Sequence, residues 1–201
     1  MLNLVLFGPP GCGKGTQSAR VACRFNLLHL STGELFRAEV KRRTPLGNEL
    51  AGYMKKGLLV PDSIVLKYVY KTAIKDINGP GFIFDGFPRT IAQAEVMDKL
   101  LIKKNLIIDI VLCLIVEKQE LFDRMIGRSE DSGRSDDNEK IIYRRMEVYE
   151  EQTKPLKEYY LKQNKVSFIS GMAPVKVVAE RIAHVIRHYI HEKEILREVM
   201  G

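Results

Sequence analysis

Short apolar runs alternate along this chain with longer stretches whose apolar residues recur every three to four positions. The runs have the length of strands. They predict strands over Leu2–Phe7, Leu27–Leu30, Phe82–Asp85, Ile107–Val116 and Val166–Ser170. Strands that are apolar throughout and separated by helices are typical of a parallel sheet covered on both faces. We therefore predict an α/β fold in three layers, with a central parallel five-stranded sheet.

Helical spacing fills the intervals between these strands. It predicts helices over residues 15–24, 62–76, 90–103, 118–126 and 137–163, and an apolar stripe that begins after Pro174. The tail, residues 190–201, keeps Ile195, Leu196 and Val199 at helical spacing. Three outcomes stay open for it: the tail extends the last helix, packs on the core, or contacts a partner.

Two segments interrupt the alternation. Residues 31–60 predict two helices with no strand between them, which indicates a small lobe hinged on the core. Residues 127–137, GRSEDSGRSDD, carry charge and glycine without apolar periodicity and predict an exposed, mobile loop. The remaining residues, 1–30, 61–126 and 138–201, are expected to form the core.

The first strand leads directly into residues 8–17, GPPGCGKGTQ. Glycines let backbone N–H groups turn inward around phosphate oxygens, Lys14 adds a mobile cation, and the start of the next helix adds its positive dipole end. The hydroxyl residue, Thr16, stands one place later than in the common G-x-x-x-x-G-K-[ST] pattern. The alternative is a glycine-rich turn that binds nothing. We predict that the loop binds nucleotide phosphates.

Composition narrows the classes of protein. The chain has 201 residues, of which 45% are hydrophobic and 28% charged, as in an ordinary globular domain. The net charge of +7 raises the possibility of nucleic-acid binding, but the arginines fall singly beside glycine, aspartate and proline, which favours phosphate pockets. No apolar run has the length of a membrane span. Cys12, Cys23 and Cys113 are odd in number and lack metal-ligand spacing, which predicts reduced thiols in a cytoplasmic protein.

Asp85 ends the apolar strand Phe82–Asp85. Ligands of open α/β sheets bind at the carboxyl ends of the strands. There the carboxylate could hold Mg²⁺, through water because Mg²⁺ releases its water reluctantly. The alternative is a side chain that caps the following turn.

Five blocks of the chain resemble the nucleoside monophosphate kinases, and they occur in that family's order. They are residues 8–17, Leu30–Arg37 (LSTGELFR), Gly57–Asp62 (GLLVPD), Asp85–Arg89 (DGFPR) and Gly133–Asp137 (GRSDD). The resemblance covers essentially the whole chain and is closest to adenylate kinases with a short lid. It implies a P-loop fold with a nucleoside-monophosphate-binding lobe over residues 31–60 and a lid over residues 127–137. It also implies a monomer that, with Mg²⁺, transfers a phosphoryl group from ATP to AMP and gives two ADP. The lid has no Cys-x-x-Cys pair, so no structural zinc is expected.

The resemblance also assigns roles to individual residues. The ATP site would comprise Gly11, Cys12, Gly13, Lys14, Gly15, Thr16, Arg124, Arg128 and Ala173. The AMP site would comprise Thr32, Arg37, Leu58, Leu59, Val60, Gly86, Phe87, Pro88, Arg89, Gln93, Arg134 and Arg145. The catalytic cations would be Lys14, Arg89, Arg124, Arg128, Arg134 and Arg145. Phosphoryl transfer brings many negative oxygens together, so positive charge held in place is the means of catalysis.

The choice of acceptor depends on a few positions. Thr32 and Thr90 stand where the similar uridylate/cytidylate kinases tend to carry alanine and asparagine. Gln93 would pair with the adenine edge, because an amide donates and accepts at once; otherwise it would be an exposed helix residue. We favour AMP, with a UMP/CMP kinase as the alternative.

Other classes of protein and site fit the sequence less well. A guanine-nucleotide switch would carry Asn-Lys-x-Asp, which this sequence lacks. A silent binding module would have lost Lys14 or the arginines. The histidines, His29, His184, His188 and His191, show no catalytic pairing; the last three share a helix at metal-binding steps but are better explained as a helix surface.

Overall fold

The computed structural model describes residues 1–71, 79–132 and 138–200. Its sheet comprises β1 (Leu2–Phe7), β2 (Leu28–Ser31), β3 (Gly81–Asp85), β4 (Ile110–Ile115) and β5 (Val166–Ser170). The pairings are parallel and the strand order is β2-β3-β1-β4-β5. The predicted α/β fold with a parallel five-stranded sheet is confirmed.

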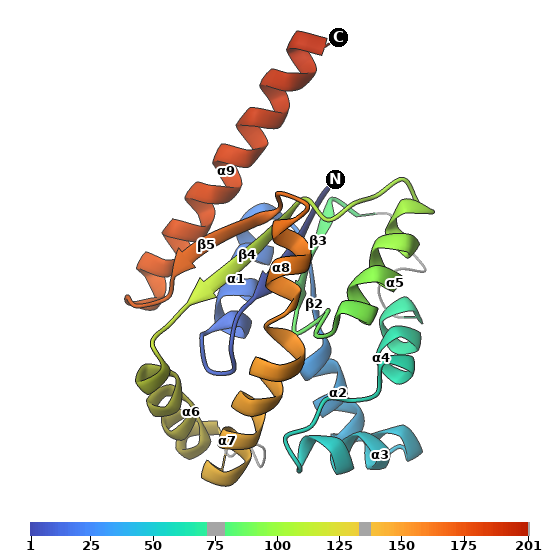
Figure 1. Ribbon diagram of the computed structural model, residues 1–201, viewed down its shortest axis with the longest axis vertical. Coiled ribbons are helices and arrows are strands. Elements are labelled where there is room, and N and C mark those ends of the chain that lie inside the picture. Colours follow the sequence, from blue (N-terminus) through green and yellow to red (C-terminus); the bar gives the residue numbers. More distant parts are fainter. Residues whose placement is uncertain (72–78, 133–137, 201) are drawn as a thin grey trace.

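Helices cover both faces of the sheet (Figure 1). Side chains of β1 alternate between the faces, as the pleat requires: Leu4 and Leu6 join one buried cluster, Val5 and Phe7 the other. The first cluster includes residues of α1 (Lys14–Phe25) and α9 (Val175–Met200). The second includes residues of α4 (Asp62–Val69), α5 (Ile91–Ile102) and α8 (Leu156–Leu161). The sheet edge that carries the loop after β1 is therefore held from both sides.

Residues 31–60 contain α2 (Thr32–Lys41) and α3 (Pro45–Met54), the two helices expected there. Each helix begins at a side-chain cap: Ser31 accepts from the Glu34 N–H, and Thr44 from the Gly47 N–H. Pro45 occupies the first turn, where its missing N–H costs nothing.

The predicted loop over residues 127–137 is wrong for its first residues. Helix α6 (Lys118–Ser132) continues past the expected end at Ile126. Extending a helix that has already formed costs little, so polar residues continue it without an apolar stripe. Residues 133–137, with the rest of the predicted lid, lie outside the described residues.

Two other predicted elements are shorter or divided. The strand expected over Ile107–Val116 is only Ile110–Ile115, because the Asp109 carboxylate instead accepts the Asn3 N–H at 2.8 Å, before β4 begins. The helix expected over residues 137–163 is α7 (Glu139–Val148), a π-helical turn (Tyr149–Thr153) and α8. Pro155, which has no N–H, lies where α8 begins.

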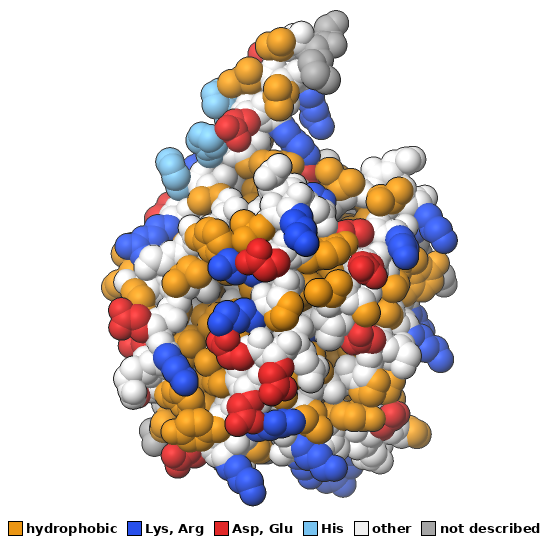
Figure 2. All heavy atoms as spheres, in the orientation of Figure 1, with side chains coloured by type: hydrophobic (Ala, Val, Ile, Leu, Met, Phe, Trp, Pro, Cys, Tyr) orange, Lys and Arg blue, Asp and Glu red, His pale blue; other side chains and the backbone are white. Residues whose placement is uncertain are grey.

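The tail continues the last helix, the first of the three outcomes considered. Helix α9 projects beyond the rest of the molecule (Figure 1). Ile195, Leu196 and Val199 on it are 45–78% exposed, and Figure 2 shows apolar and histidine side chains along the projection. Within the described ranges, each helix falls short of the length or the apolar character that a membrane-crossing segment needs.

Candidate active site

The loop between β1 and α1 takes a shape that only glycine permits at two positions. A Cβ atom on Gly8 would lie 2.9 Å from the Leu114 carbonyl oxygen, and one on Gly11 would lie 2.7 Å from the Leu121 carbonyl oxygen. Both glycines also have positive φ, +148° and +82°. Neighbouring elements thus fix the path of the loop.

Lys14 and the start of α1 make this loop a site for anions. The Lys14 ammonium donates to the carbonyls of Gly8 and Pro9, at 2.8 Å each. All residues of α1 are among those described. Gly13, its N-cap, has no side chain that could accept a hydrogen bond from the N–H groups of the first turn. Uncapped N–H groups and the helix dipole both attract phosphate oxygens.

The loop opens into a cleft of about 760 Å³ between the sheet edge, α2, the α3–α4 connection and α6–α7. Among the described residues that line it, six are basic and two, Glu34 and Asp85, are acidic. The basic residues are Lys14, Arg37, Arg89, Arg124, Arg128 and Arg145. The cleft is therefore suited to a strongly anionic ligand.

Most of the residues expected from the sequence line this cleft together. Besides the basic residues they are Gly11, Cys12, Gly13, Gly15, Thr16, Thr32, Leu58, Leu59, Val60, Asp85, Gly86, Pro88, Gln93 and Ala173. Phe87 is the exception: it is absent from the lining, and its buried ring packs on Phe84 at 6.0 Å between centroids. Arg134 lies outside the described residues.

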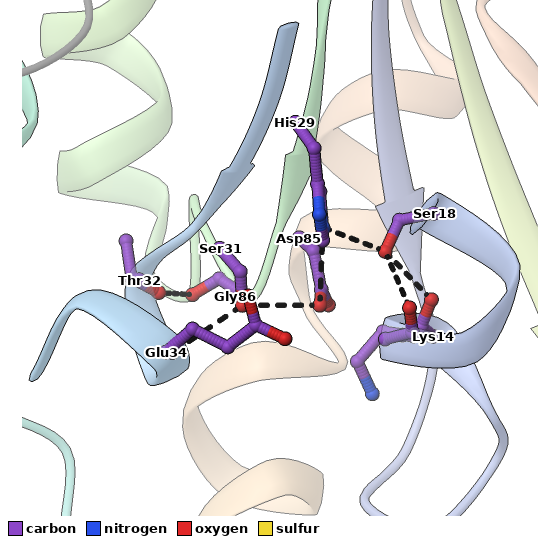
Figure 3. Close-up of polar contacts among 9 residues, drawn as sticks. Lys14, Ser18, His29, Ser31, Thr32, Glu34, Asp85 and Gly86 are labelled. Carbon is purple, nitrogen blue, oxygen red and sulfur yellow. Dashed lines mark hydrogen bonds and ion pairs between the residues drawn. The ribbon is translucent and has the colours of Figure 1, made fainter. Parts of the chain in front are cut away.

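Asp85 lies at the end of β3, beside the phosphate loop (Figure 3). Its Oδ2 accepts from the Ser31 hydroxyl at 3.3 Å and lies 3.9 Å from His29 Nε2. Burial raises the pKa of this carboxyl, but His29 and the charges of Lys14 and Arg89 outweigh burial and hold the pKa below its ordinary value. Asp85 therefore carries a negative charge in a position facing the loop.

Two arginines that line the cleft, Arg37 and Arg89, lie against glycines. A Cβ atom on Gly33 would lie 3.3 Å from the Arg37 guanidinium nitrogens. A Cβ atom on Gly86 would lie 3.0 Å from Arg89 Nη2 and 3.1 Å from Thr32 Oγ1. These glycines leave room for the guanidinium groups to enter the cleft.

On the opposite wall, Arg124 and Arg128 come from one face of α6 and both line the cleft, as their spacing predicted. Arg124 donates to the Gly171 carbonyl at 3.0 Å and pairs with Glu120 at 2.6 Å. The side chain is thus held from two directions, between α6 and the connection after β5.

Gln93 is buried, with 1% of its surface exposed, so the alternative of an exposed helix residue is wrong. Its Oε1 accepts from the Arg89 backbone N–H at 2.7 Å, and its Nε2 donates to Asp62 Oδ1 at 2.7 Å. Asp62 also accepts from the Thr90 hydroxyl at 2.8 Å.

Several residues of this site were not predicted from the sequence. Gly33 leaves room for Arg37, the Gly171 carbonyl accepts from Arg124, Asp62 accepts from Gln93, and His29 contacts Asp85. Gly33 could have been found, because it stands within LSTGELFR. The contacts of Asp62 and His29 join segments distant in sequence, and no local pattern predicts them.

Comparison with known proteins gives concordant matches. The family model described as "Adenylate kinase" matches residues 6–165. A Porphyromonas gingivalis protein named adenylate kinase is 44% identical over 186 residues, covering 92% of this chain and 96% of that protein. Adenylate kinases of Phocaeicola vulgatus and Pseudarthrobacter chlorophenolicus are 43% and 40% identical, over 89% and 93% of this chain and 94% and 97% of their own lengths.

Proposed function

Since the chain belongs to the adenylate kinase family, we propose that it transfers a phosphoryl group reversibly from ATP to AMP, with Mg²⁺, and gives two ADP. The observation that carries this proposal is that one cleft holds both a phosphate-binding loop and, facing it, the arginines proposed for the acceptor. A single anionic ligand at the loop would not contact the arginines on the other wall of the cleft. Two facing phosphate chains would contact the basic residues on both walls.

In this proposal an oxygen of the AMP phosphate attacks the terminal phosphorus of ATP, and the bond from that phosphorus to the bridging oxygen breaks. The electron pair of the broken bond stays with ADP. Lys14, Arg124, Arg128 and Arg145 stabilise the charge that spreads over the moving group, while Arg37 and Arg89 hold the acceptor phosphate. Arg134 is proposed to stabilise the same transferred phosphoryl group, and this proposal depends on its sequence motif alone. Alignment and fixed charge together supply the rate enhancement.

The residues present fit a magnesium ion. The lowered pKa of Asp85 keeps its carboxylate charged at the edge of the phosphate loop, 3.5 Å from the Cβ position of Gly15. Mg²⁺ usually keeps several of its waters and is held by one or two carboxylates together with the substrate phosphates. When bound, Mg²⁺ would neutralise part of the phosphate charge.

We propose further that residues 31–60 act as the acceptor lobe and residues 127–137 as the lid, the latter beginning within α6. Closure of two such lobes would keep water from the transferred group. We also propose that the enzyme works as a monomer in the cytoplasm; the free thiols of Cys12, Cys23 and Cys113 fit a reducing compartment.

A panel of acceptors tests the function. Purified protein with ATP and Mg²⁺ is assayed for ADP formation with AMP, UMP, CMP and GMP, beside a Lys14→Met preparation that reports contaminating kinases. We expect AMP to give the highest kcat/KM. Stronger turnover of UMP or CMP would reject the proposal in favour of a pyrimidine kinase, and ATP binding without transfer to any monophosphate would reject both.

A further inference from the structure

We propose that Asp62 is a positioning residue that sets base specificity. It holds the Gln93 amide in one orientation and so fixes the hydrogen-bonding pattern that the cleft offers to the acceptor base. This inference rests on the proposed function, because it takes the acceptor base as the group that Gln93 meets.

The geometry ties four groups together. Asp62, the first residue of α4, accepts from Gln93 Nε2 through Oδ1 and from the Thr90 hydroxyl through Oδ2. Thr90 caps α5 and accepts the Gln93 backbone N–H at 3.1 Å. The Arg89 N–H donates to Gln93 Oε1. The side chain of Gln93 is thereby fixed at both ends of its amide.

The chemistry of these partners permits one orientation of the amide. A carboxylate only accepts and a backbone N–H only donates. A turned amide would place its oxygen against Asp62 and its NH₂ against the Arg89 N–H. Both hydrogen bonds would then be lost around a side chain of which only 1% is exposed, and an unsatisfied buried donor or acceptor is costly.

Among the described residues, one hydrogen bond reaches each end of the amide, and each end has room for a second. Nε2 has a second hydrogen and Oε1 a second lone pair, and Gln93 belongs to the lining of the cleft. Adenine presents a ring acceptor beside an amino donor, whereas a 6-oxopurine presents a ring N–H beside a carbonyl. A fixed amide matches one of these patterns, and an amide free to turn can serve both.

The test compares AMP with IMP, which differ only in this donor and acceptor pattern. Asp62→Asn keeps the shape but can present either oxygen or NH₂ to Gln93, so it removes the penalty against the turn at Asp62 and leaves only the one at the Arg89 N–H. We expect the ratio of kcat/KM for AMP to that for IMP to fall about tenfold, with KM for AMP raised and kcat for AMP within about threefold of wild type. Asp62→Ala removes the acceptor and gives a second variant with the same expected fall.

Asp98→Asn is the matched control. Asp98 also accepts from a hydroxyl and an amide, those of Tyr159 at 2.8 Å and Gln163 at 3.5 Å, but it is not part of the cleft lining. Its AMP to IMP ratio should equal that of wild type. A Gln93→Ala background should abolish the effect of Asp62→Asn on the ratio, since the effect passes through the amide.

Two results would overturn the inference: a ratio within about twofold of wild type in the Asp62 variants, or a fall that persists in the Gln93→Ala background. Failure of the proposed function looks different. It would appear in the wild-type protein, as preference for UMP or CMP over AMP, whatever the variants do.

Discussion

Gly57, in the connection between α3 and α4, lies against Ile141 of α7 so closely that a Cβ atom on it would stand 3.1 Å from the Ile141 carbonyl oxygen. The same atom would lie 3.2 Å from Cγ of Arg145. The wall of the cleft formed by residues 57–60 therefore meets α7 where Arg145 enters the cleft. Glycine at this position allows the proposed acceptor lobe and the arginine to approach each other.

We expect Gly57→Ala to displace Arg145 and to lower kcat/KM for AMP about ten- to a hundredfold, since small misplacements of aligned groups are costly. KM for ATP should change less. Steady-state kinetics with each substrate varied in turn checks this. Gly52→Ala in α3, where a Cβ atom meets nothing within 4 Å, is the control. It should keep its kinetics and gain about 1 kcal/mol in free energy of unfolding.

Gly57 has a φ of +67°, so alanine at this position would also strain the backbone, and this strain is a second possible cause of lost activity. Gly57→Asn separates the two causes, because asparagine tolerates positive φ but still carries a side chain. Activity restored by asparagine would contradict the contact explanation and attribute the loss to backbone strain.

Lys14→Met should reduce kcat/KM by about a thousandfold or more, because about 4 kcal/mol of transition-state stabilisation is a usual loss for one charged group at the transferred phosphoryl. Methionine keeps the aliphatic length but cannot donate to the Gly8 and Pro9 carbonyls. Lys118→Met, on the exposed start of α6, controls for the loss of a positive charge. Activity above a tenth of wild type in Lys14→Met would show that the loop lysine is dispensable.

Local rules were sufficient for some parts of the fold and site. The strand over residues 166–170 was predicted to the residue, because a short apolar run indicates a strand by itself. Residues 8–17 were predicted to form the phosphate loop from their glycine pattern. The arginines on α6 followed from their four-residue spacing. The ends of β4 and α6 did not follow: one depends on Asn3 meeting Asp109, 106 residues away, and the other on helix propagation through polar residues.

The contacts that tune the site were beyond local rules for the same reason. Asp62 and Gln93 are 31 residues apart and meet only because α4 and α5 pack together. Gln93 could be predicted as a ligand-facing amide by resemblance, but not as a buried one with both ends engaged. Phe87 was expected to line the AMP site because of its motif. Its ring is large and apolar, and it is buried in the core instead.

His29 should stabilise the fold in a manner that depends on pH. Its contact with the Asp85 carboxylate raises its pKa above the ordinary 6.5, against the opposing effect of partial burial. A raised pKa means that the contribution is fully present below about pH 6.5 and is lost as the pH rises through the folded-state value. We expect His29→Gln, without nucleotide or Mg²⁺, to lose more free energy of unfolding at pH 6 than at pH 9.

Urea unfolding at both pH values measures this difference. His188→Gln is the control, because His188 is exposed on α9 beside Glu192. Equal destabilisation of His29→Gln at the two pH values would mean that His29 acts by packing and by its 2.9 Å contact with Ser18, and not by its charge.

The three cysteines should differ sharply in reactivity toward a thiol reagent such as a disulfide dye. Cys23 is exposed on α1, whereas Cys12 and Cys113 are 2% and 3% exposed. Burial raises the pKa of Cys113 to about 11, and the reactive species is the thiolate. We expect about one thiol per chain to react rapidly in the folded protein and the others to react only on unfolding.

Cys23→Ser should remove the fast phase. A fast phase that survives this substitution would place Cys12 within reach of solvent, with the phosphate loop opening on the timescale of the assay.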